Sequence, residues 1–350
     1  MITLFAAMAV GCAGAQDKQA AKGEVKTVGV EEFAEIMAQA DVRLIDVRTP
    51  KEYAEGHLAG AEIIDVKAAD FAERIKNIKG VVAVYCRSGK RSLMAAEQLA
   101  KQGCTVYNLD GGILAWQKAG KTTTTVETDI FTTNSGKLVK IHALMHSSIR
   151  IEYDGWEIEI DPCSNLRGRT VDYSAMPKAD LILVTHEHPD HYDPDAINLL
   201  TAGATDGTQI VMNSRCVELF SKWGKAMENG ERLQLAEDIE IVAVPAYNTT
   251  KGREQFHPKG RDNGYILTLD GLRIYIAGDT EDIPEMADIK DIDVAFLPCN
   301  QPYTMTPEQL VRAAKVVKPK VLFPYHYGET DVSGIPAQLP GIDVRIRHYE

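Results

Sequence analysis

Short apolar segments alternate with amphipathic ones through the first third of the chain. The apolar segments are bounded by polar residues, which predicts buried strands, and the segments between them carry apolar residues at helical spacing. The predicted strands are 42–47, 81–86 and 105–109. The predicted helices are 31–40, 68–77 and 91–103, the last closed by Gly103. Strands that alternate with helices predict a parallel sheet with helices on its faces.

Strand patterns dominate from Leu138 onward. The stretch 138–162 contains two or three strands with a turn at Asp154-Gly155, and 264–278 is a predicted hairpin through Asp270-Gly271. Further predicted strands are 181–185, 209–212, 239–247, 294–298 and 321–326. A helix is predicted over 306–317, with Thr306 as its N-cap. Two β-rich halves with helices outside predict a layered α/β sandwich.

The length of 350 residues exceeds what one hydrophobic core usually spans, so two domains are expected. The segment 121–137 is rich in Thr, has few large apolar residues and lacks a helical period. We interpret it as a linker or the start of the second domain. The expected division is therefore a leader over 1–22, a first domain over 23–120 and a second over 138–350.

Composition adds two exclusions. Hydrophobic residues make up 45% and charged residues 25%, which is ordinary for a soluble globular protein. The net charge of -12 argues against a nucleic-acid partner, because such proteins usually carry a basic face. No internal stretch reaches the roughly 18 apolar residues that a membrane span needs.

The first residues form a distinct segment. The stretch MITLFAAMAVGCAGAQDKQ begins with a short apolar run, continues with small residues and then turns polar, which is typical of an export signal. Residues 9–12 also resemble a bacterial lipobox, in which the cysteine, here Cys12, is lipidated after cleavage. We therefore expect an exported protein, periplasmic or attached to a membrane through Cys12; the alternative is a disordered apolar terminus.

A basic loop joins the predicted strand 81–86 to the helix that begins at Arg91. Its cysteine, Cys86, ends the strand, so backbone N–H groups and the positive end of the helix dipole face the thiol. Such a loop holds an anion or lowers the pKa of the thiol. The alternative is a buried structural cysteine beside a basic surface loop. None of the six cysteines forms a CxxC pair, so no zinc knuckle or thioredoxin motif is indicated.

Three ordered motifs resemble a single rhodanese domain that covers nearly all of 24–120: LIDVRTPKEYAEGHLAGA, YCRSGKRS and YNLDGGILAWQKAG. The resemblance implies that Cys86 is the catalytic residue and carries a persulfide. It also implies that the loop residues bind the sulfur substrate: Arg87, Ser88, Gly89, Lys90 and Arg91. In this family a six-residue loop goes with sulfur transfer, and related phosphatases have a loop one residue longer.

The same resemblance assigns roles to residues outside the thiol loop. Asp46 and Arg48 match a DVR motif that braces the structure near the loop. Glu52 and His57 match an E-x4-H element whose role is structural rather than catalytic.

A dense cluster of metal-binding side chains lies in THEHPDH, residues 185–191. His186 and His188 follow a predicted strand, and side chains two residues apart in extended backbone can converge on one ion; Asp190 and His191 follow at once. Neutral imidazoles suit Zn, Fe or Mn, and the carboxylate suits a harder ion or a bridging water. The spacing HxHxDH after a strand predicts a metal site.

This motif resembles that of the metallo-β-lactamase superfamily, and the resemblance extends over about 138–350. It implies an αββα sandwich, with Asp279 in IAGDT as a bridging ligand and His326 in FPYHYG as the last ligand. Asp161 matches a structural aspartate. His146 precedes SSIRIE as a histidine does in the branch resembling ascorbate-6-phosphate lactonase; a role in the pocket and a plain polar role at the strand start remain open.

One ligand of the superfamily is missing from its usual place. A histidine is expected after the strand 239–247, where this chain has Asn248. The nearby histidine is His257, in FHPKG, which either becomes the ligand or binds substrate. If His257 does not ligate, the site holds one ion.

The resemblance implies two divalent ions, Zn or Mn, with Fe as a further option. His186, His188 and His257 would hold one ion, and Asp190, His191 and His326 the other, with Asp279 between them. A metal-bound water would attack the substrate, and Asp190 is also a candidate catalytic residue. Residues expected near the substrate are Cys163, Lys259, Asn300 and Tyr303.

The pairing of domains predicts a bifunctional enzyme that takes a small-molecule substrate and a sulfur donor and acceptor. One part is a thiosulfate or persulfide sulfurtransferase, and the other hydrolyses an ester, lactone, amide or phosphoester. Two alternatives remain open. The metal domain is a persulfide dioxygenase with one Fe, or the rhodanese domain is a non-catalytic sulfur or redox sensor that regulates the hydrolase.

Overall fold

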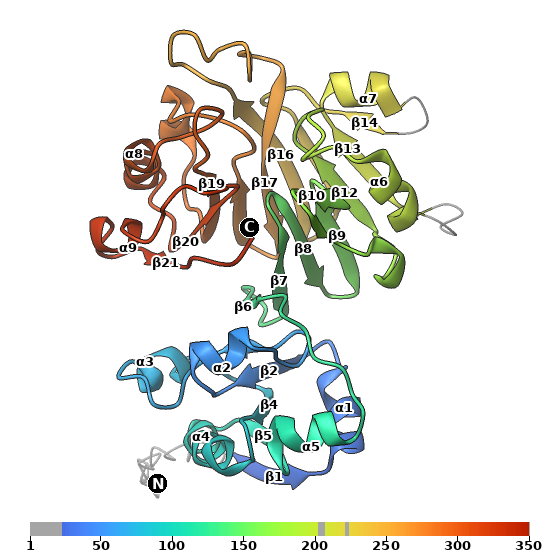
Figure 1. Ribbon diagram of the computed structural model, residues 1–350, viewed down its shortest axis with the longest axis vertical. Helices are drawn as coiled ribbons and strands as arrows, with labels where there is room; N and C mark the ends of the chain where they lie inside the picture. The colour runs from blue at the N-terminus through green and yellow to red at the C-terminus, as the bar shows by residue number, and fades with distance from the viewer. Residues whose placement is uncertain (1–22, 202–206, 221–223, 350) are drawn as a thin grey trace, which may run out of the picture.

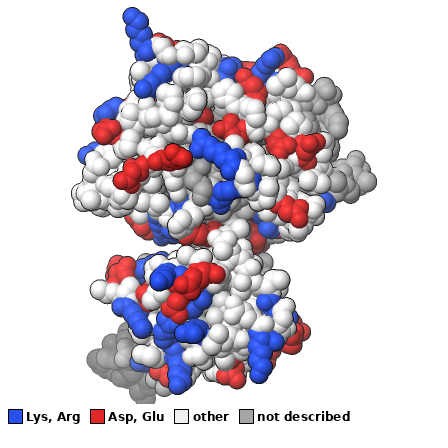
Figure 2. Space-filling view, viewed as in Figure 1, with Lys and Arg blue, Asp and Glu red and all other residues white. Residues whose placement is uncertain are grey.

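The computed structural model describes residues 23–201, 207–220 and 224–349. The predicted export leader and Cys12 lie outside these residues. Within them the chain forms two domains that meet at a constriction (Figures 1 and 2). On the face shown in Figure 2, acidic and basic side chains are interspersed.

The first domain is a five-stranded sheet in the order β1-β5-β4-β2-β3, and every pairing in it is parallel. Its strands are β1 (Glu24–Val28), β2 (Val42–Asp46), β3 (Glu62–Ile63), β4 (Val81–Tyr85) and β5 (Thr105–Leu109). Its helices are α1 (Val30–Met37), α2 (Pro50–Ala54), α3 (Phe71–Ile75), α4 (Lys90–Lys101) and α5 (Gly112–Lys118). The predicted parallel sheet is confirmed, although α1 and α3 are shorter than their apolar patterns suggested.

Successive side chains along each strand point to opposite faces of this sheet, so the domain has two hydrophobic cores, one on each face. Ile45, Val82 and Val84 face α3 and α4, whereas Leu44 and Ala83 belong to the cluster that includes side chains of α1, α2 and α5. Because both faces are covered by helices, the strands read as continuous apolar runs.

The second domain contains two seven-stranded sheets packed face to face between helices (Figure 1). The first sheet is formed by β14 (Lys225–Ala226), β13 (Gln209–Met212), β12 (Leu181–Val184), β9 (Trp156–Ile160), β8 (Ser148–Tyr153), β7 (Leu138–Met145) and β6 (Thr128–Thr132). The second is formed by β15 (Arg232–Ala236), β16 (Ile239–Ala246), β17 (Asp262–Leu269), β18 (Leu272–Ile276), β19 (Val294–Pro298), β20 (Val321–Tyr325) and β21 (Asp343–Val344). The predicted αββα sandwich is confirmed.

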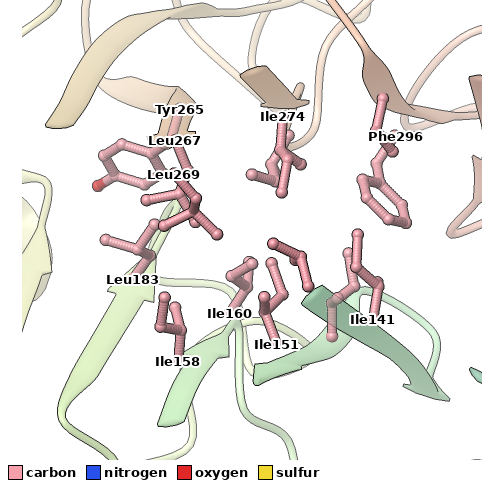
Figure 3. Close-up of a cluster of buried hydrophobic side chains, with 14 of the residues drawn as sticks. Ile141, Ile151, Ile158, Ile160, Leu183, Tyr265, Leu267, Leu269, Ile274 and Phe296 are labelled. Carbon is pink, nitrogen blue, oxygen red and sulfur yellow. The ribbon is translucent and has the colours of Figure 1, made fainter. Parts of the chain in front are cut away.

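The two sheets bury one apolar core between them (Figure 3). Ile151 and Ile160 of the first sheet face Leu267, Ile274 and Phe296 of the second. Helices cover the outer faces: α6 (Pro194–Thr201), α7 (Ser214–Phe220) and the 3-10 turn η1 (Tyr173–Ala175) on the first sheet, and α8 (Pro307–Val317), α9 (Ile335–Gln338) and the 3-10 turn η2 (Pro284–Asp288) on the second. A small hairpin, β10 (Asn165–Leu166) and β11 (Arg169–Thr170), leaves the sandwich after β9.

The segment 121–137 contains β6, which pairs antiparallel with β7 at the edge of the first sheet. Its second half is thus part of the sandwich. Its first half contacts the other domain, because His57 Nε2 lies 2.8 Å from the carbonyl oxygen of Val126 and the Tyr53 hydroxyl accepts from the Thr128 N–H at 3.3 Å. A cavity of about 680 Å³ lies at this junction and is lined by both domains.

The last described residues, which follow β21 of the second sheet, bind β6 at the edge of the first sheet. Arg345 and Arg347 both bind the buried carboxylate of Asp129, at distances of 2.7 to 2.8 Å. Two residues further on, the Tyr349 carbonyl accepts the His146 N–H at 2.8 Å.

The described residues contain neither a membrane-spanning helix nor a disulfide bond. No helix in them combines the length and apolar character needed to cross a membrane. Their five cysteines are buried and free: Cys86, Cys104, Cys163, Cys216 and Cys299.

Candidate metal centre and thiol loop

The predicted metal-binding residues are carried by loops at one edge of the sandwich. The loop with His186, His188, Asp190 and His191 follows β12, and Asp279 follows β18. The remaining residues come from the ends of β7, β17 and β20: His146, His257 and His326. Residues far apart in sequence therefore meet where several strands end, which is how α/β folds usually build a site.

The first group comprises His186, His188, His257 and Asp279, whose ligand atoms lie within 4.8 Å of one another. His188 Nδ1 lies 3.0 Å from His186 Nε2 and 3.3 Å from His257 Nε2. Asp279 Oδ2 lies 3.3 Å from His257 Nε2 and 3.9 Å from His186 Nε2. Three imidazole nitrogens and one carboxylate oxygen thus converge on one point, a donor set that suits Zn.

The second group comprises His146, Asp190, His191 and His326. Asp190 Oδ2 lies 3.1 Å from His146 Nε2 and 3.5 Å from His326 Nε2. The inclusion of His146 settles where this residue lies: its side chain is 1% exposed and its ring centroid is 3.7 Å from that of His326. The left-handed backbone at His146, with φ of 56°, aims the side chain back into the site, and the sequence pattern carries no signal for that turn.

Asp279 lies between the two groups and faces both. Its Oδ2 faces the first group, and its Oδ1 lies 3.4 Å from both His191 Nε2 and His326 Nε2. Asp279 Oδ1, His191 Nε2 and both ring nitrogens of His326 are buried and have no hydrogen-bond partner among the described residues. Buried polar atoms without partners are costly, so this arrangement fits a bound cation at the second group.

Asp161 and Thr185 orient two of the imidazoles. Asp161 Oδ2 lies 2.8 Å from His191 Nδ1 and accepts from the Thr185 hydroxyl at 2.7 Å; that hydroxyl lies 3.0 Å from His186 Nδ1. A partner on Nδ1 leaves Nε2 as the free donor for an ion. The structural role expected of Asp161 corresponds to these contacts.

The electrostatics also favour a cation. Burial lowers the pKa of His186 well below its ordinary value, and it lowers that of His326 too, so both rings are neutral at neutral pH. At His191 burial opposes the charged form, but the carboxylates of Asp279, Asp161 and Asp190 outweigh it and raise the pKa well above its ordinary value. Three carboxylates around one ring mark a position that attracts positive charge.

The histidine missing after β16 is replaced in space by His257. Asn248 does not join either group; its Nδ2 donates to the Tyr303 carbonyl at 2.7 Å, and its N–H donates to the His257 carbonyl at 2.9 Å. The loop between them is held by the buried carboxylate of Glu281, which accepts from Thr249 and Thr250 at 2.7 to 2.9 Å. This loop brings His257 into the first group, beside His188 and Asp279.

Of the four residues expected near the substrate, Tyr303 and Cys163 contact a residue in or beside the groups, and Asn300 lies close to Gly328, two residues after His326. The Tyr303 carbonyl contacts His257 Nδ1 at 3.2 Å, and the buried Cys163 Sγ donates to the Pro189 carbonyl at 3.7 Å. Lys259 instead pairs with Glu285 at 2.6 Å and contacts the Tyr247 hydroxyl at 3.0 Å.

Cys86 lies at the base of a separate loop at the end of β4. The Ser92 hydroxyl donates to Cys86 Sγ at 3.4 Å. Burial on its own raises the pKa of the Cys86 thiol, but hydrogen bonds from Ser92 and from the N–H groups of Ser88 and Gly89 outweigh it and lower the pKa. The expected activation thus comes more from hydrogen-bond donors than from the loop cations.

The cations of this loop have different partners. Arg87 and Lys90 are exposed, whereas Arg91 forms a two-pronged ion pair with Glu52, at 2.6 and 2.8 Å. Glu52 also closes the capping box of α2 with Thr49. It therefore holds Arg91 at the mouth of the loop, in keeping with a structural role.

Asp46 and Arg48 form a buried ion pair whose shortest contact is 2.6 Å, and Arg48 also donates to the Gly56 carbonyl at 2.8 Å. These contacts brace the backbone beside the end of β4.

Comparison with known proteins assigns both domains. The model for the beta-lactamase superfamily domain matches residues 140–326, and the model for the rhodanese-like domain matches residues 29–119. The chain belongs to the beta-lactamase superfamily. Its superfamily domain is preceded by a rhodanese-like domain, so both resemblances drawn from sequence are confirmed.

Relatives of the superfamily domain are named as metal-dependent hydrolases. A UPF0173 metal-dependent hydrolase from Thermococcus kodakarensis is 33% identical over 197 residues, which cover 54% of this chain and 85% of that protein. A solved structure assigned as a metal-dependent hydrolase, from Parabacteroides distasonis, is 50% identical, with a TM-score of 0.61 over 64% of this chain and all of that chain. A metallo hydrolase from Ignicoccus hospitalis is 29% identical, with a TM-score of 0.50 over 59% of this chain and 94% of that chain.

Proposed function

We propose that the chain is a bifunctional enzyme, a metal-dependent hydrolase joined to a rhodanese-type sulfurtransferase. The single observation that carries the hydrolase is the placement of Asp279, one oxygen of which faces each of two His-rich groups. Two Zn or Mn ions held there would supply water activation and polarise a carbonyl or phosphoryl oxygen.

The chain's own residues do the rest of the hydrolase's work. Asp161 and Thr185 fix the tautomers of His191 and His186. Asp190 is the most exposed member of the second group, with 30% of its side chain accessible, so substrate reaches the site from its side. The Asp190 carboxylate is there the candidate to accept or return a proton during hydrolysis of an ester, lactone, amide or phosphoester.

The sulfurtransferase rests on Cys86 and the donors around it. In the proposed reaction the Cys86 thiolate attacks the outer sulfur of thiosulfate, the sulfur–sulfur bond of thiosulfate breaks, and sulfite leaves. The resulting persulfide then gives its outer sulfur to a thiol or cyanide acceptor and regenerates the Cys86 thiolate. The Ser92 hydroxyl and the loop N–H groups stabilise the anionic sulfur in both steps.

One experiment separates this proposal from a persulfide dioxygenase. Metal content of the full-length protein is measured together with O₂ uptake on glutathione persulfide. We expect two Zn or Mn per chain and no O₂ uptake. One Fe per chain with O₂ uptake would overturn the hydrolase.

The sulfurtransferase is tested by thiosulfate:cyanide turnover of the wild-type chain and Cys86→Ser. We expect turnover to be lost in C86S and kept in Cys104→Ser, which alters another buried thiol of the same domain. Equal turnover in C86S would refute the assignment. Thiosulfate that alters ester hydrolysis in the wild type but not in C86S would favour a sulfur sensor.

A further inference from the structure

The hairpin β10–β11 has an unusual residue at its tip. Leu166 pairs with Arg169, so the loop has two residues, Arg167 and Gly168, and both have positive φ, at 50° and 83°. Two positive φ values define the tight hairpin turn that favours Asn-Gly. A long side chain in the first position is strained, and such strain is concentrated at functional sites.

The base of this hairpin is fastened to the metal-binding loop. The Ser164 N–H donates to Asp193 Oδ2 at 2.8 Å, and Cys163 Sγ donates to the Pro189 carbonyl at 3.7 Å. Pro189 precedes Asp190 and Asp193 follows His191 by two residues. The hairpin tip is thus set in a fixed place relative to the second group.

The Arg167 guanidinium lies over the loop that follows His326. A Cβ atom on Gly328 would lie 3.1 Å from Arg167 Nη1 and 3.3 Å from Asn300 Oδ1, so a side chain at 328 would crowd both. Gly328 also has a φ of 53°, which favours glycine there. Within the described parts of the chain, Arg167 is exposed and forms neither a hydrogen bond nor an ion pair. The positive charge of Arg167 therefore lies beside the loop that follows His326, and no acidic side chain among the described residues pairs with it.

A cavity of about 200 Å³ is lined by this hairpin and by residues that neighbour the second group in sequence. Met145, which precedes His146, and Tyr349, whose carbonyl binds the His146 N–H, form part of its wall together with Gly328. Arg169 is a second cation of the wall, and its Nη1 is buried without a hydrogen-bond partner among the described residues. The exposed Glu329 is the acidic member of the lining, so two Arg against one Glu leave the cavity positive.

We propose that Arg167 and Arg169 bind an oxyanion group of the substrate, a carboxylate or a phosphate, in the cavity beside the second metal-binding group. This inference rests on the proposed hydrolase. A guanidinium presents paired N–H donors that match the oxygens of both anions. On binding, Arg167 would give up no partner among the described residues, and Arg169 would give up only a long contact with the His348 carbonyl at 3.4 Å. Met145, Leu166 and Tyr349 line the same cavity and would contact the carbon chain that joins the anion to the bond to be cleaved.

The test compares two esters with the same leaving group: the 4-nitrophenyl monoester of adipic acid, which is anionic, and its neutral methyl ester. The variant is Arg167→Asn, because Asn tolerates positive φ and keeps the turn. We expect kcat/KM for the anionic ester to fall about tenfold and that for the neutral ester to stay within about twofold. Arg232→Ala removes an exposed arginine on β15 and is the matched control, with both values unchanged.

A second arm does not depend on hydrolysis. Binding of inorganic phosphate to the full-length protein, stripped of metal with a chelator, is measured by calorimetry for the wild type, R167N and R232A. We expect R167N to weaken phosphate binding about tenfold and R232A to leave it unchanged. If phosphate binding depends on Arg167 but the metal analysis gives one Fe with O₂ uptake and neither ester is cleaved, the anion site stands and the proposed hydrolase fails. An unchanged preference for the anionic ester in R167N, or phosphate binding that R167N does not weaken, would overturn the anion site.

Discussion

Replacing His257 tests which residue completes the first metal-binding group. In His257→Ala the group keeps His186, His188 and Asp279 but loses the nitrogen 3.3 Å from both His188 Nδ1 and Asp279 Oδ2. Loss of a residue that merely orients a ligand costs about 10- to 100-fold in metal affinity. Loss of a ligand should cost at least the upper value, roughly 2.7 kcal/mol. The second group retains all its members.

The assay is equilibrium dialysis of the metal-free protein against buffered Zn, with metal content measured at each free concentration. The wild type should bind two ions per chain. H257A should bind one ion as the wild type does and the other at least about 100-fold more weakly. The matched control is Asn248→Ala, because Asn248 occupies the place in sequence where the superfamily ligand is expected. If H257A binds two ions normally and N248A loses one, the assignment of His257 is wrong.

Three further predictions concern the thiol loop, the domain junction and the turn before Asp279. Because hydrogen bonds lower the pKa of Cys86, the pH dependence of its alkylation rate with iodoacetamide should have a midpoint below pH 9. Ser92→Ala should raise that midpoint, and an unchanged midpoint would count against the role of Ser92. Asp129→Asn leaves two half-buried arginines short of their buried anion and should lower the free energy of unfolding by about 3 kcal/mol in denaturant titrations, the lower end of the range for breaking a buried pair. A loss under about 1 kcal/mol would contradict this. Burial raises the pKa of Asp129, but Arg345 and Arg347 outweigh burial and lower this pKa from its ordinary 3.8 to about 2. The contribution of the Asp129 carboxylate to stability is therefore present above about pH 4 and is lost as the pH falls toward 2. The difference in melting temperature between wild type and D129N should narrow across that range. Gly278→Ala should lower metal affinity as well as melting temperature, since its Cβ would lie 2.7 Å from the Asn263 carbonyl at a φ of 64°; full metal affinity in this variant would refute the close fit of the turn.

The sequence predicted the strands well, because both domains obey simple patterns. Buried parallel strands such as β4 are continuous apolar runs, and the hairpin turns at Asp154-Gly155 and Asp270-Gly271 carry the residues that positive φ requires. The edge strand β6 was harder to recognise. It is Thr-rich and gains its place by pairing with β7 rather than from a pattern of its own.

Some residues of the candidate metal site could also be predicted from sequence patterns, and others could not. The residues in THEHPDH, IAGDT and FPYHYG directly follow strands, so their convergence could be predicted from the motif. His257 could not be placed, because its loop is shaped by tertiary contacts with Glu281, which lies beyond the next two strands. The role of His146 could not be predicted for a related reason, because the direction of its side chain depends on the left-handed backbone at this one residue.

The contacts of residues 345–349 have a consequence for the order in which the protein matures on the ribosome. Asp129 is separated from Arg347 by 218 residues of chain, and His146 receives its backbone acceptor from Tyr349. The strands of the rhodanese-like domain are complete by Leu109, so that domain can close its sheet and mature its thiol loop early in synthesis. The metal cradle gains its last support only when Tyr349 has left the exit tunnel. The thiol loop can therefore form before the candidate metal centre, because His146 gains its backbone partner only from the last described residues.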